Sequence, residues 1–207
     1  VTITDAPTVT QLKTINAATT GAITLDVTNG ALSGDAADLV LAFAGTVTEH
    51  TGTVTITDAP NVAQLKAINA ATTGAITLNV TNGALSGSAA DLVDVFAGTI
   101  TEHTGTVTIT DAPSVTELKA INAGTTGAIT LDVANGALSG TAANLVLAFA
   151  GTVTEHTGTV TISDAPSVAQ LKAINAATTG AITLSDATGA LSGSAADLVL
   201  AFAGTVT

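Results

Sequence analysis

The residues in this sequence best suited to chemistry are three Glu-His pairs, which recur within nearly identical copies of the stretch GTVTEHTGTVTITDAP. They are Glu49-His50, Glu102-His103 and Glu155-His156. Histidine acts as a base or a metal ligand near neutral pH. Adjacent residues on a strand point to opposite faces, however, so the two members of a pair cannot grip one ion together.

No serine, cysteine or second base accompanies these pairs at a fixed spacing, as nucleophilic catalysis would require. We therefore expect each pair to lie in a solvated turn at the seam between repeats. A ladder of successive histidines that binds a metal is the alternative. Nothing in the sequence favours an enzyme.

A second recurring group is an aspartate that ends a predicted strand immediately before Ala-Pro. The four copies are Asp5, Asp58, Asp111 and Asp164. An Asx turn, or a favourable charge near a helix N-terminus, accounts for this position. Calcium is the alternative, because hard cations take carboxylate and carbonyl oxygens. Neither the EF-hand pattern nor the glycine-rich nonapeptide is present. These aspartates are the calcium ligands that the sequence suggests, and no other cofactor is predicted.

Other polar residues also recur once per repeat. We expect the lysines to be solvated on the first helix and the asparagines to satisfy backbone groups late in that helix. They are Lys13, Lys66, Lys119 and Lys172, and Asn16, Asn69, Asn122 and Asn175. The Thr-x-Thr segments indicate exposed strand positions, which threonine favours, or a flat hydroxyl surface for binding.

Composition excludes several classes of partner. The chain has 16 acidic residues, four lysines and no arginine, which gives a formal charge of −12. Arginine is the usual residue for phosphate and base recognition, so nucleic acid binding is disfavoured, as is an anionic membrane surface. No apolar run approaches the roughly 18 residues of a membrane-spanning helix. The absence of cysteine excludes disulfides.

The strongest signal is a tandem repeat with a period of 53 residues. The copies span 1–53, 54–106, 107–159 and 160–207, the last being truncated, and the first two differ at only eight positions. Because the chain starts and stops partway through a repeat, we expect it to be part of a longer protein. The four copies are predicted to form one continuous solenoid.

Each repeat predicts two strand–helix modules of about 26 residues. Capping-box patterns at Thr8 and Asp35 begin helices over about 9–18 and 36–44, and Gly45 fits a C-terminal cap. Alternating segments such as TVTIT and AITLDV predict strands. Strands separated by helices imply parallel pairing. The expected fold is an α/β repeat solenoid with a parallel sheet. Hairpins at Asn29-Gly30 and Thr51-Gly52, which give ββα modules, are the alternative.

The segments DAPSVAQLKAINAATTGAITL, ALSGSAADLVLAFAGTVT and EHTGTVTI resemble repeats of giant surface proteins of marine cyanobacteria and other aquatic bacteria. The resemblance covers the whole chain and implies secretion to the cell surface, with a role in adhesion, envelope structure or motility. It supplies no catalytic residue.

The sequence therefore leads us to expect a structural spacer or stalk in a very large extracellular or cell-surface protein. Each repeat would bury its apolar face against its neighbours, which are its principal partners. A binding module that presents the Thr-rich sheet face to a glycan, an ice or mineral surface or a partner protein is the alternative.

Overall fold

The computed structural model describes residues 1–186 and 189–207. Internal contacts divide the chain into two compact units. One comprises Val1–Leu85 with Asp94–Gly105, and the other comprises Ser86–Val93 with Thr106–Thr207. Each unit thus holds about two of the four repeats.

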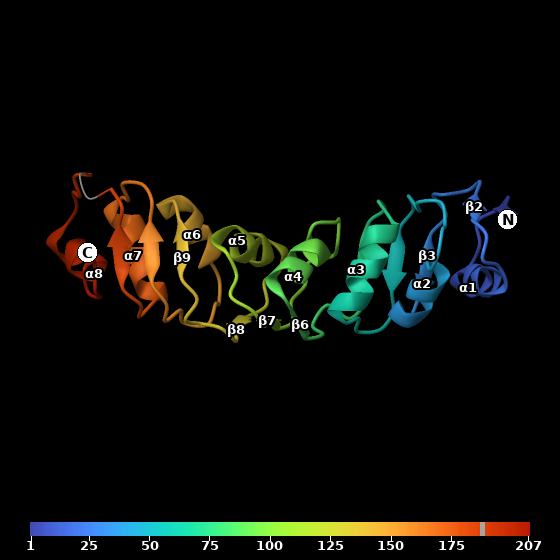
Figure 1. Cartoon of the computed structure of the whole chain (residues 1–207), viewed down its shortest axis with the longest axis horizontal. Coiled ribbons are helices and arrows are strands. Elements are labelled where there is room, and N and C mark those ends of the chain that lie inside the picture. Colours follow the sequence, from blue (N-terminus) through green and yellow to red (C-terminus); the bar gives the residue numbers. More distant parts are fainter. Residues whose placement is uncertain (187–188) are drawn as a thin grey trace. The chain divides into compact units, whose positions relative to one another are not determined.

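Short strands alternate with helices along each unit (Figure 1). The first unit contains β1 (Thr2–Ile3), α1 (Val9–Ala18), β2 (Thr24–Leu25), β3 (Leu32–Gly34), α2 (Ala36–Ala42), β4 (Val54–Ile56), α3 (Val62–Ala71) and β5 (Ile76–Leu78). The segment where the units divide holds β6 (Leu85–Gly87) and α4 (Ala89–Phe96). The second unit contains β7 (Val107–Ile109), α5 (Val115–Gly124), β8 (Ile129–Leu131), β9 (Leu138–Gly140), α6 (Ala142–Ala148), β10 (Val160–Ile162), α7 (Val168–Ala177), β11 (Ile182–Leu184) and α8 (Ala195–Ala201).

The strands pair in parallel, with a helix in each crossover. In the first unit β4 lies between β3 and β5, and β1 pairs with β2. In the second unit β10 lies between β9 and β11, and β7 pairs with β8. The fold is an α/β repeat solenoid of strand–helix modules, as predicted.

The alternative with hairpins is wrong for the described residues. The Asn29-Gly30 turn does not fold β3 back onto β2, because β2 pairs with β1 while β3 pairs with β4. Hairpins would relieve the mismatch between strands, which are spaced at about 4.8 Å, and helices, which are spaced at about 8–10 Å. Sheets of only two or three strands limit how far that mismatch accumulates.

The first helix of every repeat begins as the sequence predicts. Thr8, Asn61, Ser114 and Ser167 each form a complete capping box. At the second helix Ser88, Thr141 and Ser194 each accept a hydrogen bond from a first-turn amide, whereas Asp35 makes no side-chain cap bond to α2. Its carboxylate instead accepts a hydrogen bond from the Thr57 hydroxyl at 2.7 Å. The helix ends at Ala42 rather than near residue 44, and Gly45 follows with a φ of +73°.

The core is a layer of small apolar side chains between helices and strands. Leu12, Leu39 and Ile56 are fully buried. Strand alternation is as predicted: Ile23 and Leu25 are buried, while Thr24 and Asp26 are exposed. Among the described residues, no helix combines the length and apolar character needed to cross a membrane.

Candidate functional site

Each histidine of the Glu-His pairs is buried and binds a neighbouring turn of the solenoid. The His50 Nε2 atom lies 2.6 Å from the Gly30 carbonyl oxygen on the preceding turn. Its Nδ1 atom lies 3.3 Å from the Thr72 hydroxyl on the following turn. Only 2% of the His50 surface is exposed, and its ring contacts Phe43 with the ring centroids 5.8 Å apart.

The other two histidines bind the preceding turn in the same way. His103 Nε2 lies 2.6 Å from the Gly83 carbonyl oxygen. His156 contacts the Gly136 carbonyl oxygen through Nε2 at 2.5 Å, and the Thr178 hydroxyl through Nδ1 at 3.3 Å. The histidine is therefore a repeated bridge between turns, not a single site.

The hydrogen bonds favour one tautomer. A carbonyl oxygen only accepts, so Nε2 carries the proton and donates. The Thr72 hydroxyl donates to the His50 carbonyl oxygen at 2.8 Å and accepts from the Gly74 amide at 2.9 Å. Burial lowers the pKa of His103 and of His156, since the surroundings disfavour a charged ring, although the bond to the glycine carbonyl partly opposes this effect. These two rings are neutral at pH 7.

The expectation of a solvated Glu-His turn is half wrong. Glu49, Glu102 and Glu155 are exposed, but the histidines beside them are buried. Opposite orientations of adjacent residues account for this difference. Among the described residues, no group of three or more histidine, aspartate or glutamate side chains could hold a metal ion.

The strand-end aspartates bind the helix of the preceding turn. An Asp58 carboxylate oxygen accepts from the Ala36 amide at 2.8 Å, at the first residue of α2. Asp111 and Asp164 bind the first residues of α4 and α6 in the same way, each at 2.7 Å. The charge therefore lies at a helix N-terminus, but that helix belongs to the previous repeat. Asp5 is exposed and has no such helix before it in the described chain. The structure does not bring the four aspartates together.

The recurring asparagine also acts on a neighbouring helix, which corrects the expectation that it serves its own. The Asn16 amide donates to the Leu41, Ala42 and Ala44 carbonyl oxygens at the end of α2, at 2.9, 3.3 and 2.6 Å. Asn69, Asn122 and Asn175 make the equivalent contacts. One side chain thus satisfies several of the carbonyl groups that a helix end leaves unpaired.

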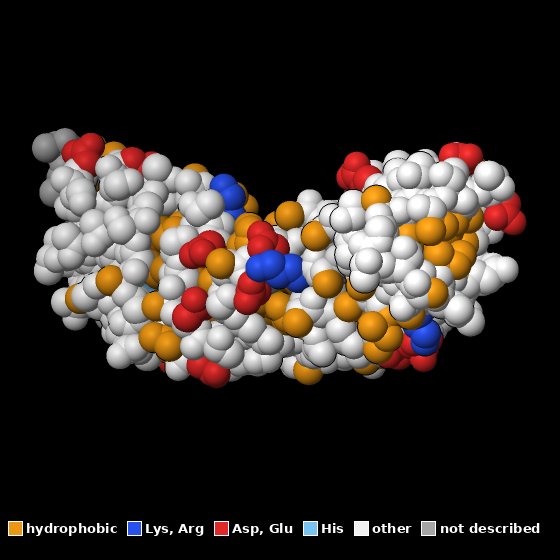
Figure 2. Space-filling model, turned by 45° about the vertical axis from the view of Figure 1, so that its right-hand side comes forward, with side chains coloured by type: hydrophobic (Ala, Val, Ile, Leu, Met, Phe, Trp, Pro, Cys, Tyr) orange, Lys and Arg blue, Asp and Glu red, His pale blue; other side chains and the backbone are white. Residues whose placement is uncertain are grey.

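The lysines are partly exposed, yet they bridge the two helices of a repeat. Lys13 pairs with Asp38, while Lys66 pairs with Asp94 at 3.0 Å. Lys172 pairs with Asp197 at 2.9 Å, and this bond holds the pKa of Asp197 below its usual value. In the third repeat, Lys119 donates to the Asn144 amide oxygen at 2.8 Å. On the face in Figure 2, lysine side chains lie beside acidic ones.

Hydroxyl groups form short rows across the sheets. Ser33, Thr55 and Thr77 are directly opposite one another on β3, β4 and β5. Ser139, Thr161 and Thr183 form the same row on β9, β10 and β11. These side chains are exposed or half-buried. The Thr-rich face therefore exists as rows of two or three hydroxyl groups, with Thr2 and Thr24 forming a row of two.

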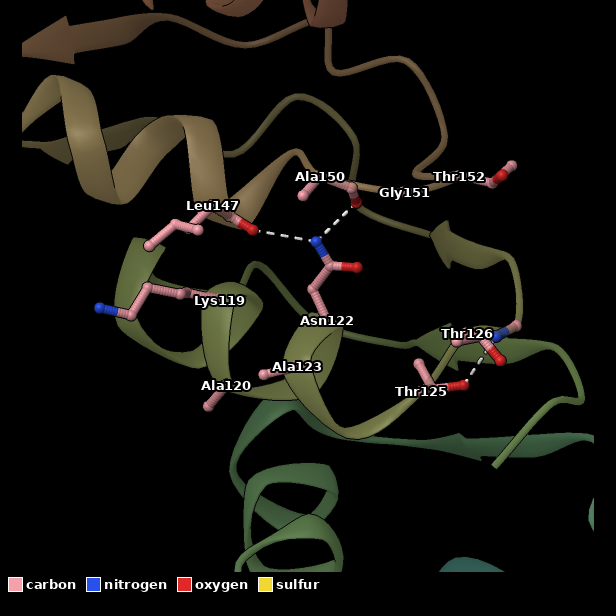
Figure 3. Close-up of a pocket in the computed structure, with 11 residues that line it drawn as sticks. Lys119, Ala120, Asn122, Ala123, Thr125, Thr126, Leu147, Ala150, Gly151 and Thr152 are labelled. Carbon is pink, nitrogen blue, oxygen red and sulfur yellow. Dashed lines mark hydrogen bonds between the residues drawn. The ribbon is translucent and has the colours of Figure 1, made fainter. Parts of the chain in front are cut away.

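A shallow groove lies between the ends of the two helices of a repeat. In the third repeat it has a volume of about 500 Å³ and is lined by residues such as Lys119, Ala123 and Leu147. Figure 3 shows the Asn122 amide extending from α5 to the Leu147 and Ala150 carbonyl oxygens beside it. The corresponding grooves in the first and second repeats measure about 410 and 290 Å³. Among the described residues, the groove of the third repeat has a mainly small and apolar lining, with Lys119 as its titratable side chain.

Sequence reasoning missed the partners of the histidine, namely Gly30 and Thr72. The turns are also packed tightly at Gly74, where a Cβ atom would lie only 1.7 Å from the Gly52 carbonyl oxygen. These partners lie 20 or 22 residues apart in the chain, an offset that the 53-residue period does not reveal.

Comparison with protein-family models, curated proteins and solved structures finds no match to this chain.

Proposed function

We propose that this chain is a structural spacer or stalk segment of a very large secreted or cell-surface repeat protein. Its task in this proposal is mechanical: to add ordered length by stacking one turn on the next. A role in adhesion, envelope structure or motility would belong to the parent protein. No catalytic activity is proposed.

The observation that carries this proposal is the use of the recurring polar side chains. The buried histidine, the strand-end aspartate, the asparagine and the lysine each bind a neighbouring turn or helix. A binding site would leave some of these groups directed at a ligand. Here they join modules whose apolar faces are buried only by stacking, as in other repeat proteins.

The test is small-angle X-ray scattering on chains with four and eight copies of the repeat. The spacer proposal predicts that the maximum dimension roughly doubles with copy number, because each repeat contacts only its neighbours. A matched control replaces His103 and His156 by alanine, which should loosen the array without changing its length in residues. If the eight-copy chain instead forms a ring or separate compact bodies, the spacer proposal fails.

The rows of hydroxyl groups support a second candidate, a binding module for a glycan, an ice or mineral surface or a partner protein. The row Ser33–Thr55–Thr77 is presented at the strand spacing of about 4.8 Å. The triple variant S33A/T55V/T77V removes the hydroxyls with little change in shape. Retention on polysaccharide or mineral supports and thermal hysteresis in ice should fall only if this face binds. T20V is the control, since this exposed threonine lies outside the strands.

Calcium is the one cofactor that we propose to test. The Asp58, Asp111 and Asp164 carboxylates each use one oxygen on a helix amide, which leaves the other oxygen for a cation. Isothermal titration with calcium should then show heat that the triple variant D58N/D111N/D164N lacks. Equal heats for both proteins would remove these aspartates from consideration.

A further inference from the structure

An exposed asparagine precedes a glycine in the same turn of the first three repeats. The pairs are Asn29-Gly30, Asn82-Gly83 and Asn135-Gly136, and the fourth repeat has Thr188-Gly189 at this place in the sequence. Each of the three asparagines is exposed, whereas the glycine after it is half-buried. Because glycine has no side chain to shield its backbone nitrogen, the side-chain amide of an asparagine just before it is open to attack from that nitrogen.

The reaction open to such a pair is deamidation. The Gly136 backbone nitrogen forms a bond to Asn135 Cγ and gives its proton to solvent, while the bond from Cγ to Nδ2 breaks and ammonia leaves. The product is a cyclic succinimide, and water then opens one of its two carbonyl groups. Opening at one gives aspartate, and opening at the other gives isoaspartate, whose main chain runs through the former side chain. Water is the one reactant that the chain does not supply, and nothing is oxidised or reduced.

The following turn holds the third of these pairs from both sides. His156 Nε2 donates to the Gly136 carbonyl oxygen at 2.5 Å, just after the asparagine. The Thr157 amide donates to the Ala134 carbonyl oxygen at 2.8 Å, just before it. Asn135 therefore combines an exposed side chain with a backbone that is fixed on either side. The first two pairs are held in the same way, by His50 with Thr51 and by His103 with Thr104.

The backbone of the pair is also packed tightly against that turn. A Cβ atom at Gly158 would lie 2.4 Å from the Gly136 carbonyl oxygen and 2.5 Å from the Asn135 carbonyl oxygen. A succinimide ring requires a ψ angle at the asparagine outside the regions that L-residues ordinarily occupy. The peptide that joins Asn135 to Gly136 must therefore rotate before the ring closes. This rotation shifts both carbonyl groups from their places against the following turn.

We propose that Asn29, Asn82 and Asn135 are sites of spontaneous deamidation, each controlled by the histidine bridge from the following turn. While the bridge is closed, the glycine carbonyl is held and the peptide does not rotate. Local opening of the turn releases it, and native proteins open locally at a lower free energy than that of global unfolding. This inference does not depend on the spacer role.

The isoaspartate product makes a transient opening permanent. It adds one carbon atom to the main chain between residue 135 and Gly136, which displaces the glycine carbonyl from His156. It also adds a negative charge to a chain whose formal charge is already −12. The bridge at that turn cannot close again, so each event loosens the array at one repeat. Aspartate, the other product, carries the same charge but keeps the original path of the main chain.

Peptide mass spectrometry after timed incubation measures deamidation separately at the three sites of one full-length chain. In urea, where the turns are unfolded, the three Asn-Gly pairs should react at similar rates. In the native chain each pair should react at least roughly tenfold more slowly, which corresponds to about 1.4 kcal/mol of protection by the closed turn. This comparison requires no variant to fold. Equal rates in the native and unfolded chain would overturn the proposal.

The variant H156A identifies the histidine as the control. It should raise the rate at Asn135 roughly tenfold, which corresponds to about 1.4 kcal/mol of lost protection. The two sites that keep their histidines should react as in the parent chain. E155A is the matched control and should change none of the three rates, because Glu155 points to solvent. No acceleration at Asn135, or an equal acceleration at all three sites, contradicts the proposal.

The effect of the product is tested by comparing two chains with the same charge. N135D carries the new carboxylate on an unaltered main chain and should keep the urea midpoint of the parent. The aged chain with isoaspartate at position 135, separated by ion exchange, should have a lower midpoint. Equal midpoints for these two chains would show that the extra main-chain carbon does not open the bridge.

Discussion

Replacing His156 by alanine tests the histidine bridge most directly. The imidazole lies between two neighbouring turns, with Nε2 2.5 Å from the Gly136 carbonyl oxygen. Removing it leaves that carbonyl without its donor, which costs about 1–3 kcal/mol for a buried group. The ring also contacts Phe149, with the centroids 5.8 Å apart, and losing such a contact costs about 0.5–1.5 kcal/mol. Because Gly136 is only half-buried, the loss at its carbonyl should lie below the upper end of that range. Together the two losses should lower the free energy of unfolding of H156A by about 3 kcal/mol.

Glu155 offers a matched control, because it is the adjacent residue and points to solvent. E155A should change the free energy of unfolding by less than about 0.5 kcal/mol, as exposed substitutions usually do. Urea denaturation followed by circular dichroism measures both variants. Amide hydrogen exchange at Thr179 locates the loss, because its amide donates to the His156 carbonyl oxygen at 2.9 Å.

The two variants distinguish a structural bridge from a polar turn. If H156A loses less than about 1 kcal/mol, the ring is not a structural bridge of the expected strength. If E155A loses as much as H156A, the effect belongs to the loop as a whole and the reasoning from opposite faces is wrong.

Three further predictions concern groups that join the turns. Acidification should destabilise the fold, because the two histidines with lowered pKa values stay neutral in the folded chain but take up protons once unfolded. The urea midpoint should fall as the pH drops through the ordinary histidine pKa of about 6.5, and a constant midpoint between about pH 7.5 and pH 5 would contradict this. D164A removes the acceptor of the first α6 amide and should lower the free energy of unfolding by about 1 kcal/mol, measured by thermal or urea unfolding. D5A should leave the free energy of unfolding unchanged, and similar losses for both variants would refute the assigned role. G180A places a Cβ atom 1.7 Å from a backbone oxygen of the preceding turn and should cost more than about 3 kcal/mol by urea unfolding. G21A is at the same repeat position, but its Cβ atom would meet only the Thr19 hydroxyl at an ordinary 3.5 Å, so it should be tolerated. A stable G180A would show that the turns are not packed this closely.

Local structure was predictable where the signal is contained in a few neighbouring residues. The helix over 9–18 has the predicted bounds, because Thr8 and Gln11 form both bonds of a capping box. The alternation of Ile23 and Leu25 with polar residues identifies the buried face of a strand without any knowledge of its partner.

The partners across turns were not predictable, because the period does not set the register. Two modules per 53-residue repeat suggest offsets of 26 or 27 residues. The observed strand partners are 22 residues apart, as in Thr2 and Thr24, or 24 apart, as in Ile23 and Val47. Without this register, nothing indicates that Gly30 and Thr72 lie on either side of His50. The same missing information misplaced the role of Asn16, which binds the next helix rather than its own.

The substitutions between repeats are consistent with a distinction between residues that contact a neighbouring helix and exposed residues that do not. Leu41 becomes Asp94 in the second repeat at an exposed side position, where Asp94 pairs with Lys66. Asp38 becomes Asn144 in the third, where Lys119 still finds an oxygen acceptor. Each copy therefore changes a residue while keeping a contact to the neighbouring helix. Selection on a ligand site would be expected to preserve the exposed side chains that contact the ligand. The copies instead preserve the contacts between turns, as the proposed stacking element requires.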